Sequence, residues 1–219
     1  MSQPEVPPPI SPHSPASPTQ DQGKVKAVLG IVAILVIGAF VRVIVKAALE
    51  SPRESSRPAP ASRVEIPNTG ISLVAPCTPS PFTPKYPEGQ DPASLGINAA
   101  SFTCTYRKLQ VGVMFMSSIA NEPLSLDGAA NGAIANLESF IVRIGGTPLT
   151  HSMMSIVRQN LSGRQWSGSF RGDGTEGVYR GLALGTYTKI WTLYVLHPAG
   201  DKALTDAATQ CIESFAVTQ

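Results

Sequence analysis

One apolar segment near the start of the chain limits its architecture more than any other feature. Residues 27–41 are fifteen apolar residues without a charge, and extension to residues 25–45 gives 21 residues that include Lys26 and Arg42. An α-helix rises ~1.5 Å per residue, so 21 residues span about 31 Å, close to the hydrocarbon thickness of a bilayer. The sequence therefore predicts one transmembrane helix at residues 25–46, with membrane lipid as its partner.

Two other structures could account for this apolar segment, a buried helix and a cleaved signal peptide. A buried helix of a soluble domain would need apolar neighbours on all sides, and the proline-rich flanks offer none. A cleaved signal peptide is the nearer competitor, because residues 45–47 resemble a cleavage site. The region before the segment is long and proline-rich, and Arg42 interrupts the apolar approach to that site, which favours an uncleaved anchor.

Polar, proline-rich sequence lies on both sides of the predicted helix. Such sequence cannot bury enough apolar surface to offset the entropy lost on ordering. We expect a disordered tail at residues 1–24 and a flexible linker at residues 47–63. The spacing from Pro4 to Pro7 suits an SH3-type groove, although a solvated tail is the simpler interpretation.

The distribution of charge argues against a nucleic-acid partner. From Val64 to the end the chain has 10 Lys and Arg against 11 Asp and Glu, so the excess of positive charge flanks the apolar segment. A nucleic-acid-binding domain would carry that excess on its folded part. Beside the membrane, the same charges can meet anionic lipid headgroups.

The side of the membrane is harder to assign. Two lysines precede the helix, whereas Arg42, Lys46, Arg53 and Arg57 end or follow it. The positive-inside rule, taken literally, places the C-terminal part in the cytoplasm. The cysteine usage described below points the other way. We expect a single-pass protein of the cell membrane with an extracytoplasmic C-terminal domain, with a cytoplasm-facing module as the alternative.

The apolar patterns of residues 64–219 are those of one globular domain. Period-two patterns predict strands at 71–75, 99–107, 109–119, 149–159, 164–171, 177–184 and 187–197, with Ser162-Gly163, Asp173-Gly174 and Gly185 in the turns between the later ones. Period-3.6 patterns predict helices at 127–144 and 201–215. Together they predict an α+β fold, an antiparallel sheet of six to seven strands with two covering helices.

The order of these segments resembles a known family. The runs ISLVAPCTP, SFTCTYRKLQVGVMF, GRQWSGSF and GVYRGLALGTYTKIWTLYVLHP, with a last helix leading into CIESFAV, are similar to the PsbP-like α/β/α sandwich and to small bacterial exported domains of that shape. The resemblance covers residues 71–217 and implies an accessory or binding module. A proline-rich insertion at residues 76–92 departs from the simplest version of the pattern.

Three cysteines, Cys77, Cys104 and Cys211, lack the spacing of a zinc site. Cys77 follows the first predicted strand and Cys104 lies on the second, so the two can approach if those strands are neighbours. The similar exported domains place a Pro-Cys after the first strand with a later partner, which implies a Cys77–Cys104 disulfide worth about 3 kcal/mol. Three reduced thiols are the alternative, and Cys211 fits a small buried hydrophobe.

No catalytic motif stands out. Gly172, Gly174 and Gly177 match G-x-G-x-x-G, but strand-like sequence on both sides indicates a hairpin turn and not a dinucleotide site. His151 and His197 lie on or beside strands without an acid at motif spacing. A hydrolase-like enzyme is the alternative, and it requires a pocket that holds one of these histidines near a carboxylate and a serine.

Aromatic residues concentrate in the late strands. Trp166, Tyr179 and Trp191 belong either to a core packed on both faces of a central strand or to an exposed binding surface. We predict a membrane-anchored, non-enzymatic accessory or binding domain of the cell envelope. It would have no cofactor, and an envelope protein is a possible partner.

Overall fold

The computed structural model describes residues 61–83, 91–172 and 174–218. The predicted tail at 1–24, the transmembrane helix at 25–46 and most of the linker at 47–63 lie outside this part of the chain. Within it, neither helix has the length and apolar character needed to cross a bilayer.

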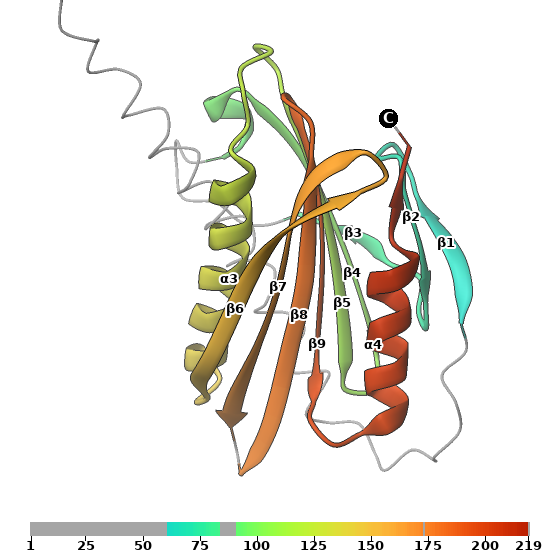
Figure 1. The fold of residues 1–219 in the computed structure, drawn as a ribbon, viewed down its shortest axis with the longest axis vertical. Helices are drawn as coiled ribbons and strands as arrows, with labels where there is room; N and C mark the ends of the chain where they lie inside the picture. Colours follow the sequence, from blue (N-terminus) through green and yellow to red (C-terminus); the bar gives the residue numbers. More distant parts are fainter. Residues whose placement is uncertain (1–60, 84–90, 173, 219) are drawn as a thin grey trace, which may run out of the picture.

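A seven-stranded antiparallel sheet forms the centre of the domain (Figure 1). Its strand order is β3-β4-β5-β9-β8-β7-β6. The strands are β3 (Ser80–Phe82), β4 (Ile97–Tyr106), β5 (Leu109–Ser118), β6 (Thr147–Arg158), β7 (Leu161–Gly172), β8 (Thr175–Gly185) and β9 (Lys189–Pro198). Strand β9 lies in the middle, and eight of its ten residues are buried. The expectation of a central strand packed on both faces is therefore confirmed.

Each face of this sheet is covered by one helix. Helix α3 (Leu126–Arg143) begins at Ser125, whose hydroxyl accepts a hydrogen bond from the Gly128 amide, and ends before Gly145 in the left-handed region. Its buried residues pack with Ile190 and Tyr194 of β9. The intervening β9 side chains, such as Trp191 and Leu193, belong to the core on the opposite face.

That opposite face carries helix α4 and a small second sheet. Helix α4 (Lys202–Ser214) is capped by Asp201, whose carboxylate accepts from the Leu204 amide. The second sheet has the order β1-β2-β10, with β1 (Ser62–Ile66), β2 (Ile71–Ala75) and β10 (Ala216–Val217). Helix, central sheet and helix form the layers expected of a PsbP-like α+β fold (Figure 1).

The structure corrects some boundaries. Sequence patterns missed β1, β3 and the 3₁₀ turn at Ala93–Leu95. The turn expected at Ser162-Gly163 lies instead at Gln159 and Asn160, both with φ near +60°, and Ser162 and Gly163 belong to β7. Two successive left-handed residues make the tight turn that matches strand twist, and asparagine tolerates this conformation.

A disulfide joins Cys77 to Cys104 with 5.9 Å between their Cα atoms. It ties the segment after β2 to β4, and so connects the small sheet to the large one. Cys211 is a fully buried free thiol on α4, and burial raises its pKa to about 12. Cys77 and Cys104 therefore form the disulfide that the resemblance implied, and Cys211 is part of the core.

Candidate functional site

The predicted aromatic surface is part of the core. Trp166, Tyr179 and Trp191 are 1%, 0% and 1% exposed. Trp166 and Tyr179 pack in the core beneath α3, and Trp191 packs beneath α4, where its indole donates to the Thr69 carbonyl over 2.8 Å. None of the three offers a ring to a partner, so any binding surface lies elsewhere.

His151 lies on β6, on the side of α3. Its Nδ1 is 2.7 Å from Glu138 Oε1, and the same oxygen accepts from the Tyr179 hydroxyl at 2.9 Å. Burial, and then the hydrogen bond to Glu138, raise the pKa of Tyr179 above its ordinary range, so the phenol stays protonated and remains a donor. This cluster joins α3 to the sheet.

His197 lies near the end of β9, on the side of α4. Its Nδ1 is 2.8 Å from the Pro198 carbonyl oxygen, which can only accept, so Nδ1 carries the proton. The ring is 2% exposed, and Nε2 has no hydrogen-bond partner among the described residues. Burial lowers the pKa of His197, and the positive charge of Arg180 lowers it further.

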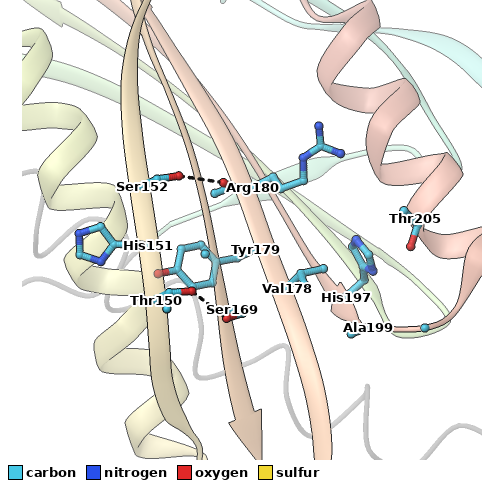
Figure 2. Close-up of a pocket in the computed structure, with 13 residues that line it drawn as sticks. Thr150, His151, Ser152, Ser169, Val178, Tyr179, Arg180, His197, Ala199 and Thr205 are labelled. Atoms are coloured by element: carbon cyan, nitrogen blue, oxygen red, sulfur yellow. Dashed lines mark hydrogen bonds between the residues drawn. The ribbon is translucent and has the colours of Figure 1, made fainter.

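A groove of about 480 Å³ lies beside α4, on the part of the same sheet face that the helix does not cover (Figure 2). Strands β6, β7, β8 and β9 form its floor, and the start of α4 forms one wall, with Thr205 facing it. Two pairs of hydroxyls cross its floor, Thr150 with Ser169 at 3.1 Å and Ser152 with Ser167 at 3.2 Å. The antiparallel register of β6 and β7 places these side chains directly opposite one another.

Arg180 is the cation of the groove. Its Nη1 donates to Thr209 Oγ1 on α4 over 2.9 Å, which holds the guanidinium between sheet and helix. Each salt bridge of the described residues involves other side chains, so Arg180 has no carboxylate partner there. A guanidinium carries five N–H donors, and most of them stay available to an acceptor in the groove.

The site therefore combines donors and acceptors suited to binding. The serine and threonine hydroxyls pair with one another, and no hydrogen bond links them to either histidine. A nucleophile paired with a base, which the hydrolase alternative requires, is not assembled among these residues. The described residues also contain no group of three potential metal ligands.

Sequence reasoning found His151 and His197 but missed Arg180 and the hydroxyl pairs. The signal was present in the spacing: Thr150 and Ser152 lie as far before the Gln159-Asn160 turn as Ser169 and Ser167 lie after it. The expected turn at Ser162-Gly163 lies three residues later than the observed one, and this error concealed the matching positions of the hydroxyls. The contact of Arg180 with α4 depends on tertiary packing, which no local pattern encodes.

No protein-family model matches the chain, and no curated protein matches it. Among solved structures, the chain is similar to cyanobacterial PsbP (CyanoP) from Synechocystis, with 13% identity and a TM-score of 0.42, covering 78% of this chain and 99% of that one. It is also similar to LpqN of Mycobacterium tuberculosis, a protein involved in cell envelope biogenesis, with 12% identity and a TM-score of 0.40, covering 73% and 91%.

Proposed function

We propose that this protein is an extracytoplasmic accessory domain, held at the membrane by residues 25–46, that binds a hydroxyl-rich ligand with an acidic group in the groove beside α4. The observation that carries the proposal is Arg180, a partly buried cation that has no carboxylate partner within the described part of the chain and lies beside two rows of hydroxyls. Hydroxyls both donate and accept, which suits a polyol. The guanidinium suits a carboxylate or phosphate on the same ligand.

Calorimetric titration of the full chain in detergent tests the ligand chemistry with three probes. Glucuronate offers hydroxyls and a carboxylate, glucose offers hydroxyls alone, and acetate offers a carboxylate alone. We expect glucuronate to bind at least about tenfold more tightly than glucose, because one charge-assisted hydrogen bond is worth roughly 1.5–3 kcal/mol. Acetate should bind more weakly than either.

Arg180→Gln should reduce glucuronate binding to the level of glucose. Arg63→Gln is the matched control, because Arg63 also donates through Nη1 to a hydroxyl, that of Ser72 at 2.8 Å, but on the small sheet. Equal binding of the three probes, or an equal loss in both variants, would contradict the proposed ligand chemistry.

The disulfide supports the extracytoplasmic side, because such bonds persist in oxidising compartments. The charges after residue 41 favour the opposite side. A Ser51→Cys variant, labelled in intact cells with a membrane-impermeant maleimide, decides between them. We expect labelling before lysis, with the unmodified chain as a blank because its free thiol is buried. Labelling only after lysis would place the domain in the cytoplasm.

A further inference from the structure

Strand β6 forms one edge of the large sheet. It is 12 residues long, and among the described residues it pairs with β7 alone. Its outer side therefore presents a row of main-chain N–H and C=O groups that no strand within residues 61–83, 91–172 and 174–218 pairs with. A long open edge of this kind is a template for another strand.

The usual protections of an edge strand lie at the two ends of β6, and its last residue is the charged Arg158. Pro148 and the irregularity between Pro148 and Thr150 occupy its first residues. From Thr150 to Val157 the register is regular, and the sequence THSMMSIV contains no Lys, Arg, Asp or Glu. The remaining stretch lacks the charges by which sheet edges commonly resist pairing.

Apolar side chains gather on the same strand. Met153, Met154 and Val157 are 38%, 60% and 80% exposed. With Leu149 they make four of the seven large hydrophobic side chains exposed among the described residues. Met153 and Met154 point to opposite faces, so apolar surface lies on both sides of the open edge.

We propose that β6 pairs antiparallel with β6 of a second copy of this chain, about a two-fold axis beside Met153, and joins two sheets into one. A second copy offers the same open edge, so one contact satisfies both rows of main-chain groups. Because residues 150–157 contain no Lys, Arg, Asp or Glu, two copies of this stretch pair without repulsion between like charges. An axis at Met153 places Met154 opposite the second copy's Ser152.

This pairing also bears on the groove. Thr150 and Ser152 lie on the groove side of β6. In the proposed register the second copy's Ile156 and Met154 would lie beside them, on the open border of the groove. The pairing itself does not depend on what the groove binds, and the two are tested separately.

Sedimentation velocity of the full chain in detergent tests the pairing. We expect a dimer that dissociates on dilution, and a Met154→Lys/Val157→Lys double variant whose dimer dissociation constant is raised about tenfold or more by charges at the paired edge. Val142→Lys is the control, because Val142 is 58% exposed on α3 and lies off the edge. A monomer at all concentrations, or an equal effect of the control, would overturn the proposal.

Oxidative cross-linking tests the register. Directly opposite residues of antiparallel strands have Cα atoms ~4.5–5.5 Å apart, within disulfide range. A Met153→Cys variant should form a covalent dimer under mild oxidation, whereas Val142→Cys should not. Cross-linking of both variants to the same extent, or of neither, would contradict an axis beside Met153.

Discussion

The indole of Trp166 lies over Gly181, the residue directly opposite it on the neighbouring strand. A Cβ atom on Gly181 would overlap the ring. Three further aromatic residues lie over directly paired glycines in the same way: Tyr194 over Gly112, Tyr179 over Gly168 and Phe170 over Gly177. Each ring fills the space that the missing side chain leaves; Trp166, Tyr179 and Tyr194 are buried there, and Phe170 is half-buried.

Gly181→Ala should therefore destabilise the domain strongly. The new methyl group would displace a ring that is 1% exposed, and overpacking of a filled core costs about 1–3 kcal/mol. Gly185→Ala, at the end of the same strand, is the control. The atom nearest to the added Cβ would be Cδ1 of the flexible Leu126 side chain, at 3.3 Å. Urea denaturation of both variants measures the difference. Equal urea midpoints for the two variants would show that the Trp166 ring moves aside without lowering the free energy of unfolding.

Most of the fold could be predicted from the sequence. Residues 127–144 carry a helical apolar stripe with a cap at each end, and the structure places α3 at Leu126–Arg143. The strands β4 to β9 were also predicted, and three of the four hairpin turns between them contain or directly adjoin glycine or asparagine; the turn at Arg107-Lys108 between β4 and β5 does neither. Strand β3 has three residues, one of them proline, so it has too little sequence to form a pattern.

The candidate site was harder to predict, because its residues come from five elements. Arg180 is unremarkable in the sequence of β8, and only the packing of α4 on the sheet brings it to Thr209. Trp166, Tyr179 and Trp191 were expected either in the core or on a surface, and apolarity alone does not separate the two. The cross-strand glycines Gly181 and Gly168 favour the core for Trp166 and Tyr179, since they leave space for those rings, whereas Trp191 lies opposite Phe115 and Leu184 and has no such signal.

Removal of the Cys77–Cys104 disulfide should lower the free energy of unfolding by about 3 kcal/mol, because the bond limits the unfolded chain over a separation of 27 residues. The Cys77→Ser/Cys104→Ser double variant and the reduced unmodified chain should unfold at the same denaturant concentration. Cys211→Ala is the control for loss of a thiol without a cross-link. A double variant as stable as the oxidised chain would contradict a stabilising role.

Tyr179→Phe should cost about 1 kcal/mol, because it deletes the hydrogen bond from β8 to Glu138 on α3 while Glu138 keeps His151 as its partner. Tyr187→Phe is the matched control, since Tyr187 is 66% exposed. Thermal unfolding at neutral pH compares the two variants. If Tyr179→Phe melts with the control, the hydroxyl contributes nothing to holding the helix on the sheet.

The buried ring of His197 predicts how stability changes with acid. Its ordinary pKa is 6.5 and its folded pKa is lower, so below about pH 6.5 the unfolded chain binds a proton that the folded chain does not. The neutral His197 ring therefore makes its full contribution to the free energy of unfolding above about pH 6.5, and this contribution is lost as the pH falls through the folded pKa. The charged neighbours, Arg180 on β8 and Asp201 before α4, act in opposite directions on the pKa.

His197→Asn tests this contribution, because the asparagine amide can replace the Nδ1 donor to the Pro198 carbonyl without titrating. We expect the unfolding free energy of this variant to fall less between pH 7 and pH 5 than that of the unmodified chain. A His197→Asn curve parallel to the unmodified one would mean that the folded and unfolded chains bind the His197 proton equally, so that its pKa is the same in both states.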